Sequence, residues 1–227
     1  MLLSVYGDSI AAAFGLSPIQ GFVPKLANHL ATSTGRYTNY LNFAQDGMTS
    51  WDLAGALEDQ IDWRDGLRAA QTICVLIGGD DLIHDLPVLL HHPSNAAIKR
   101  AMATSRAAYL SLLSTVTSVK NRRTRIAVGT IYNPFPNTPI AAEAIQLYNE
   151  AIIVPIANQF GIPIAPVHQA FAGNELPLIR GYSNGVAGSP GRSGIRYPIH
   201  PSAEGQSVIA NVFADAIASS PPTPKQG

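Results

Sequence analysis

Cysteine and charge are both scarce in this sequence. Cys74 is the only cysteine, so no internal disulfide can form and no cysteine-based metal site is possible. Charged residues make up 13% of the 227 residues, about half the usual share of roughly 25%. Lys+Arg and Asp+Glu balance at 15 each. Nucleic acids and anionic membranes both require a basic face, so we expect neither as a partner and favour a neutral, partly apolar ligand.

Long apolar runs, targeting segments and nucleotide motifs are missing as well. No stretch approaches 18 uninterrupted apolar residues, which argues against a transmembrane helix. Met1 leads directly into strand-like sequence without a basic and apolar leader, which leaves two compartments open: the cytoplasm, or a place outside it if a leader has been removed. The Gly78-Gly79 pair lacks the third glycine of a dinucleotide fingerprint. We expect no cofactor and no metal.

Short β-like runs alternate with longer amphipathic segments along the whole chain. The apolar patterns predict strands at residues 2–6, 37–43, 72–77, 125–130 and 162–167. Helical patterns cover residues 18–31, 50–64, 95–120 and 139–160. Ser50 is the expected N-cap of the second helix, Pro155 is expected to kink the fourth, and Ser202 caps a last helix that ends near Ala218.

This alternation predicts an α/β fold, in which right-handed crossovers place a parallel sheet between two helical layers. We expect a three-layer α/β/α sandwich with a flavodoxin-like, five-stranded parallel sheet in the order 2-1-3-4-5. One domain would cover residues 1–218, followed by a flexible tail at 219–227. The glycine-rich stretch 173–197 is read either as a substrate-side lid or as irregular surface. Ligands of such sheets bind at the carboxyl ends of the strands.

Four blocks of residues at these strand ends carry the chemistry. Gly7-Asp8-Ser9-Ile10 follows the first strand, and Gly47 closes the block after the second. Ile77-Gly78-Gly79-Asp80-Asp81 follows the third strand, and His200 stands just before the last helix. A serine at a strand-to-helix turn needs a base beside it and donors aimed at the developing oxyanion. In order and position, the four blocks resemble those of the SGNH or GDSL hydrolases over nearly the whole chain.

The resemblance implies a role for each block. Ser9 would be the nucleophile and would donate its backbone N–H to the oxyanion hole. Gly47 would supply a second backbone donor. His200 would take the Ser9 proton and return it to the leaving group, as the base of a triad does.

Two positions depart from the family pattern. Asp80 stands where the family places the asparagine that donates the third oxyanion hydrogen bond, and an ionised carboxylate can only accept. Tyr197 stands where the family places the aspartate that orients the base. We favour the backbone carbonyl of Tyr197 as the group that orients His200, and the alternative is an aspartate from elsewhere, such as Asp81 or Asp85.

The leading hypothesis is therefore a cofactor-independent serine esterase that acts on an uncharged carboxylic ester, whose acyl group could be short, medium, lipid-like or O-acetyl. Tyr132, Phe135 and Leu178 are expected on loops that could line an apolar acyl pocket. The alternative is a catalytically impaired binding module on the same fold, because both the oxyanion asparagine and the triad aspartate are replaced. The oligomeric state is left open.

Overall fold

Five parallel strands form the centre of the protein. The structure is a computed structural model that describes residues 1–84 and 95–219. The strands are β1 (Leu2–Gly7), β2 (Asn39–Ala44), β3 (Thr72–Leu76), β4 (Arg125–Gly129) and β5 (Ile164–Ala165). They pair in the order β2-β1-β3-β4-β5, which confirms the predicted sheet. The chain order reverses between β1 and β3, so a ligand site is expected above their carboxyl ends.

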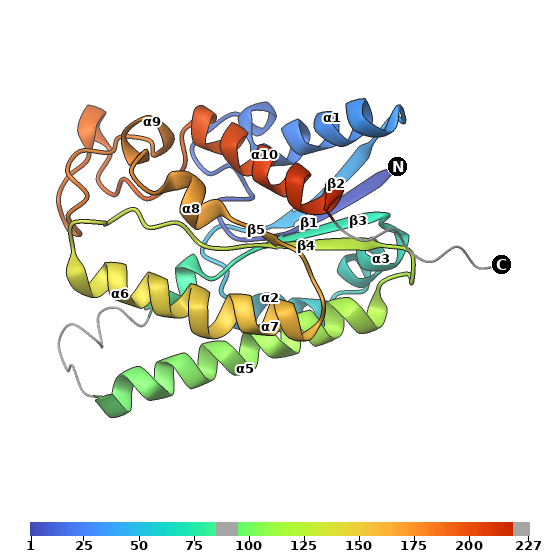
Figure 1. Ribbon diagram of the computed structural model, residues 1–227, viewed down its shortest axis with the longest axis horizontal. Helices are drawn as coiled ribbons and strands as arrows, with labels where there is room; N and C mark the ends of the chain where they lie inside the picture. The colour runs from blue at the N-terminus through green and yellow to red at the C-terminus, as the bar shows by residue number, and fades with distance from the viewer. Residues whose placement is uncertain (85–94, 220–227) are drawn as a thin grey trace.

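Helices cover both faces of the sheet (Figure 1). One layer contains α1 (Phe22–Thr34) and α10 (Ala203–Ala218), together with the short α8 (Val167–Phe171) and α9 (Glu175–Leu178). The other contains α2 (Ser50–Asp59), α3 (Ile61–Ala69), α5 (Asn95–Val119), α6 (Pro139–Tyr148) and α7 (Val154–Gln159). The three-layer α/β/α sandwich is thereby confirmed.

The strands supply two separate cores because successive side chains point to opposite faces. In β3, Ile73 and Val75 belong to the core under α2, α3 and α5, whereas Cys74 and Leu76 belong to the core under α1 and α10. All four are fully buried. Burial on both faces explains why this strand is almost uninterrupted in apolar residues. It also places Cys74 in the core, where burial raises the pKa of its thiol.

The single helix predicted over residues 50–64 is wrong, because the structure has two helices there. Gln60 adopts an extended conformation between α2 and α3. The break allows α2 to bury Leu53 and Leu57 while α3 independently buries Trp63 and Leu67. The expected N-cap is also displaced by one residue.

Thr49 caps α2, because its side chain accepts a hydrogen bond from the Asp52 N–H and the Asp52 carboxylate in turn accepts from the Thr49 N–H. Ser50 is the first helical residue, and both its N–H and its hydroxyl donate to the carboxylate of Asp81. The N-cap of α10, in contrast, is Ser202 as predicted.

Pro155 distorts the fourth helix as expected. A π-helical turn, η2 (Asn149–Ile153), separates α6 from α7 directly before the proline. Pro155 has no N–H to offer the Ala151 carbonyl, which instead accepts from the Arg106 guanidinium at 3.5 Å. By length and composition alone, Pro139–Gln159 could cross a membrane. Its buried face accounts for this apolar character, because Ile145, Ile153 and Ile156 lie in the core beneath the sheet.

Two further stretches differ from the sequence prediction. The fifth strand spans only two residues instead of 162–167, because α8 begins at Val167 and Pro166 interrupts the strand before it. The stretch 173–197 is largely irregular, as predicted, but it contains α9 and a 3-10 turn, η3 (Arg192–Gly194), besides the 3-10 turn η1 (Pro18–Gln20) nearer the N-terminus. The tail predicted at 219–227 lies outside the described residues beyond Ser219.

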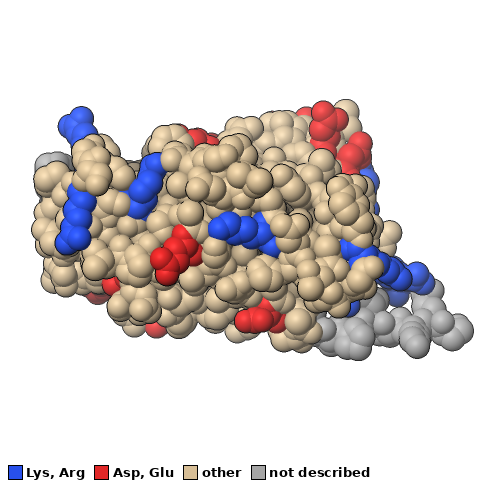
Figure 2. Space-filling view, turned by 90° about the horizontal axis from the view of Figure 1, so that it is seen from above, with Lys and Arg blue, Asp and Glu red and all other residues tan. Residues whose placement is uncertain are grey.

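The scarcity of charge is visible on the surface. Figure 2 shows the face that α1 and α10 form, with single Lys, Arg, Asp and Glu side chains scattered over wide uncharged areas. Neither sign of charge gathers into a continuous patch on this face.

Candidate active site

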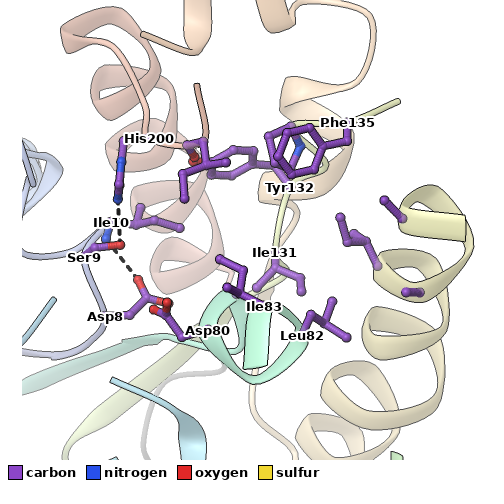
Figure 3. Close-up of a pocket in the computed structure, with 16 residues that line it drawn as sticks. Asp8, Ser9, Ile10, Asp80, Leu82, Ile83, Ile131, Tyr132, Phe135 and His200 are labelled. Carbon is purple, nitrogen blue, oxygen red and sulfur yellow. Dashed lines mark hydrogen bonds between the residues drawn. The ribbon is translucent and has the colours of Figure 1, made fainter. Parts of the chain in front are cut away.

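The turn after β1 presents Ser9 at the carboxyl edge of the sheet. A side chain at Gly7 would overlap the Leu76 carbonyl oxygen of the neighbouring strand, so only glycine lets β1 and β3 approach this closely before the turn. Asp8 then closes the turn, because its carboxyl oxygen accepts from the Ile10 N–H at 3.0 Å. Ser9 is only 7% exposed, and its hydroxyl points toward His200 (Figure 3).

The segment before α10 fixes His200 by its backbone. The His200 carbonyl accepts from the Arg180 N–H at 2.9 Å, and the Leu178 carbonyl accepts from the Ser202 N–H at 2.8 Å. The His200 ring packs on Phe14, with ring centroids 4.7 Å apart. Phe14 belongs to the nucleophile turn, because its N–H donates to the Ser9 carbonyl. The two segments therefore support each other although 191 residues separate Ser9 from His200.

Ser9 and His200 come within hydrogen-bonding distance. The Ser9 Oγ and the His200 Nε2 are 3.1 Å apart. Burial lowers the pKa of His200, Arg180 lowers it further, and Asp46 opposes the change. A depressed pKa keeps the imidazole neutral near pH 7, which is the form that accepts a proton. The structure thus joins the first and last of the four sequence blocks in one Ser9–His200 contact.

The group that orients the His200 ring through its Nδ1 is less well defined than the contact at its Nε2. The Tyr197 carbonyl accepts from the Ile199 N–H at 2.9 Å, and the Tyr197 side chain is 59% exposed. Within residues 1–84 and 95–219, no group accepts a hydrogen bond from the His200 Nδ1. Asp81 is engaged with Ser50, and Asp85 lies outside the described residues. The role of the Tyr197 backbone carbonyl in orienting His200 therefore stays a prediction.

The two backbone N–H groups that were expected to bind the oxyanion are both free to donate a hydrogen bond within the described residues. Among the described residues, the N–H groups of Ser9 and Gly47 have no hydrogen-bond acceptor. Gly47 lies in the exposed loop after β2 with a φ of 76°, a left-handed conformation that favours glycine. Its neighbour Asp46 acts electrostatically on both His200 and Asp80, so this loop borders the site.

Two carboxyl groups lie below Ser9 in Figure 3, those of Asp8 and Asp80. Burial raises the pKa of Asp8 to about 8, and the charges of Asp80 and Asp81 add to this rise. Burial also raises the pKa of Asp80 to about 6, with further contributions from Asp46 and Asp81. These pKa values favour the protonated form of Asp8 near neutral pH, whereas Asp80 is mostly ionised there and becomes protonated below about pH 6.

An apolar pocket extends from the Ser9–His200 pair toward α6 (Figure 3). Tyr132 and Phe135 line it as expected, whereas Leu178 is buried in the core beside α10 instead. The remaining apolar lining comes from the turn after β1, the helical residues 79–84, the loop after β4, α6 and the segment before His200: Ile10, Leu82, Ile83, Ile131, Pro134, Ala141, Ala144, Ile145 and Ile199.

Comparisons with known proteins identify the family of this chain. The sequence profile of the GDSL-like lipase/acylhydrolase family matches residues 5–208. The chain belongs to this family. Membership makes it a hydrolase of carboxylic esters. A search of curated proteins found no match.

Solved structures of other GDSL-type and related hydrolases share the fold. A lipase from a goat rumen metagenome has a TM-score of 0.77 at 18% identity, covering 95% of this chain and 97% of the other. An alpha/beta hydrolase from the metagenome of Lake Arreo, Spain, has a TM-score of 0.65 at 22% identity, with coverages of 96% and 94%. An acetyl xylan esterase from Geobacillus stearothermophilus has a TM-score of 0.65 at 17% identity, with coverages of 95% and 94%.

Several residues of this GDSL-family site escaped the sequence analysis. Phe14 and Arg180 flank His200, yet neither belongs to a motif. Asn149 lies in the π-helical turn and pairs with both backbone groups of Ile131, donating to its carbonyl and accepting from its N–H. It thereby holds one wall of the pocket. Ala141, Ala144 and Ile145 form a different wall, on α6, and their spacing on one helix face is a sequence signal for that wall.

Proposed function

We propose that this protein hydrolyses an uncharged carboxylic ester through an acyl-enzyme on Ser9, with His200 as general base. The observation that carries the proposal is the 3.1 Å distance between the Ser9 Oγ and the His200 Nε2, at the mouth of an apolar pocket. The substrate is uncharged because the pocket offers no basic side chain besides His200 among the described residues.

The reaction proceeds in two halves. The Ser9 Oγ attacks the ester carbonyl carbon while the His200 Nε2 takes its proton, and the carbonyl oxygen becomes an oxyanion. When the intermediate collapses, the bond to the alcohol oxygen breaks and His200 returns the proton to it. Water, activated by His200, then attacks the acyl-Ser9 ester and releases the carboxylic acid. The Tyr197 carbonyl is our candidate for orienting the imidazole through its Nδ1–H.

The free N–H groups of Ser9 and Gly47 are suited to stabilise the oxyanion. Asp80 lines the same end of the pocket, in place of the family's asparagine. Once protonated, its carboxyl group can donate a third hydrogen bond. While ionised, it opposes the developing charge.

The experiment compares wild type with Ser9→Ala and His200→Ala in the hydrolysis of p-nitrophenyl acetate and butyrate. Each variant is expected to lose all but about 0.1% of kcat, since the nucleophile and its base act as a unit. Ser33→Ala and His29→Ala on α1 are the matched controls, because both residues are exposed and lie outside the pocket. Activity of Ser9→Ala within tenfold of wild type would refute the proposal.

A binding module is the second candidate, because Asp80 replaces a donor and no described carboxylate contacts His200. The same experiment separates the two. An inactive wild type that still binds a non-hydrolysable ester analogue would favour the binding module. Turnover that depends on Ser9 would exclude it.

A further inference from the structure

The apolar pocket distinguishes between the ester substrates that the proposed function leaves open. Apart from the Tyr132 hydroxyl, its polar side-chain groups lie at one end, where Asp8, Ser9, Asp80 and His200 meet. Away from this end the lining is aliphatic or aromatic, with Leu82, Ile83 and Ile131 on the side facing α6 (Figure 3). The pocket thus has a polar end and an apolar remainder. This arrangement suits a ligand that consists of a carbonyl group attached to an apolar chain.

The one hydroxyl in the apolar part of the wall is already occupied. Tyr132 donates its hydroxyl hydrogen bond to the Ile199 carbonyl, so this group is not offered to a ligand. Its ring stacks on Phe171 at a centroid distance of 4.3 Å, which fixes the ring as an apolar surface. The hydroxyl groups of a sugar ring would find no hydrogen-bond partners in this part of the pocket, which would weaken the binding of such a ligand.

The direction of the ester follows from the proton transfer. The leaving alcohol must lie beside the His200 Nε2, because this atom returns its proton. Phe14, which is 45% exposed, and the half-buried Arg180 lie beside His200 and do not line the pocket. The alcohol therefore leaves past these residues, and the acyl group extends the other way, toward α6.

The wall on α6 contains two small residues. Ala141, Ala144 and Ile145 line the pocket from one face of this helix, and the two alanines leave space that larger side chains would fill. Asn149 fixes the opposite wall by pairing with both backbone groups of Ile131. An acetyl group would leave this space empty and its apolar surface uncovered.

We infer that the pocket selects an unbranched aliphatic acyl chain longer than acetyl, which lies between residues 79–84 and α6 with Ala144 limiting its length. The inference rests on the proposed function, because it assigns the acyl half of the same ester. Burial of each added methylene is expected to raise kcat/KM roughly twofold to fourfold until the pocket is filled.

The test measures kcat/KM for p-nitrophenyl acetate, butyrate, hexanoate and octanoate, so that only the acyl chain varies. Wild type should prefer hexanoate or octanoate over acetate by at least about tenfold. Ala144→Leu should reduce this preference by about tenfold, because the larger side chain fills space that a longer acyl chain needs. Ala142→Leu is the matched control, because Ala142 is two residues away on α6 and does not line the pocket. Its preference should match that of wild type.

A second variant covers the case in which Ala144→Leu does not fold. Ile83 lines the pocket but is 45% exposed, so Ile83→Ala should fold and should lose octanoate turnover more than acetate turnover. Turnover that depends on Ser9 but is flat across the series, or fastest with acetate, would overturn the chain-length inference alone. Turnover that is unchanged in Ser9→Ala would instead overturn the proposed function.

Discussion

Asp80 is the residue whose chemistry decides most about this site. It stands at the position of an oxyanion donor, yet it donates only when protonated. Burial and the neighbouring Asp46 and Asp81 raise its pKa to about 6, while burial lowers the pKa of His200. For the proposed mechanism, His200 must be neutral and Asp80 must be protonated at the same time. The two requirements oppose each other, because a rise in pH frees His200 to accept a proton but ionises Asp80.

We predict that wild type has a narrow bell-shaped pH profile of kcat and that Asp80→Asn widens it. The acid limb reflects protonation of His200 below its lowered pKa, and the alkaline limb reflects ionisation of Asp80 above about 6. Two unit charges about 4 Å apart at an effective dielectric near 20 repel by about 4 kcal/mol. Asp80→Asn removes this repulsion and should raise kcat at pH 7.5 by about tenfold or more.

The acid limb should be common to both proteins, because His200 is unchanged. In the variant, the alkaline limit should move to higher pH and be set by Asp8, whose pKa falls below its wild-type value of about 8 because the Asp80 charge no longer raises it. Profiles that coincide throughout would mean that the Asp80 side chain does not face the oxyanion. A slower variant would assign Asp80 an active role.

At the scale of elements, a buried hydrogen-bonded link joins the two segments that carry Gly47 and Asp80, which we propose as oxyanion donors. Asp81 follows Asp80 in the helical residues 79–84, and its carboxylate accepts from the Ser50 N–H at 2.9 Å and from the Ser50 hydroxyl at 2.5 Å. Ser50 opens α2, three residues after Gly47. Both Ser50 and Asp81 are buried, so the link fixes one loop relative to the other.

We predict that Ser50→Ala destabilises the fold and slows catalysis without affecting substrate binding. Loss of the hydroxyl leaves a buried carboxylate with one fewer donor, at a cost of about 1–3 kcal/mol in the free energy of unfolding. The Gly47 loop loses part of its support, so kcat should fall several-fold while KM stays close to wild type. Urea unfolding and steady-state kinetics measure the two effects. Unchanged stability would show that the link contributes nothing.

The helices and strands show which elements a sequence pattern can predict. The apolar run of β3 and the capping serine of α10 gave correct elements, because burial and capping act locally. The division between α2 and α3 at Gln60 was missed, since one amphipathic pattern continues across it. Phe14 and Arg180 beside His200 were missed for another reason: they lie in turns without periodicity, and only the folded chain brings them to the base.

At the scale of the whole molecule, a protein with few charges concentrates carboxyl groups at one edge of its sheet. Asp8, Asp80 and Asp81 follow adjacent strands, and burial raises the pKa of each. A carboxyl group whose pKa is higher in the folded protein than in the unfolded chain binds a proton that the unfolded chain has released. The free energy of unfolding then falls as pH rises between the two values.

We predict that Asp8→Asn stabilises the protein more at pH 7.5 than at pH 5. The folded pKa of Asp8 is about 8 against 3.8 in an ordinary environment, so wild type loses about 1.4 kcal/mol of stability per pH unit through this one group. Asparagine cannot ionise, and its carbonyl can still accept from the Ile10 N–H. The gain at pH 7.5 should therefore exceed that at pH 5 by about 3 kcal/mol.

Urea unfolding of wild type and variant at both pH values measures this difference. Asp59→Asn is the matched control, because Asp59 is an exposed aspartate at the end of α2 and its substitution should produce no pH-dependent gain. Equal gains at pH 5 and 7.5 for Asp8→Asn would mean that Asp8 is ionised in the folded protein. In that case the carboxylate beside Ser9 would carry a full charge, and the electrostatics proposed for the oxyanion would have to include it.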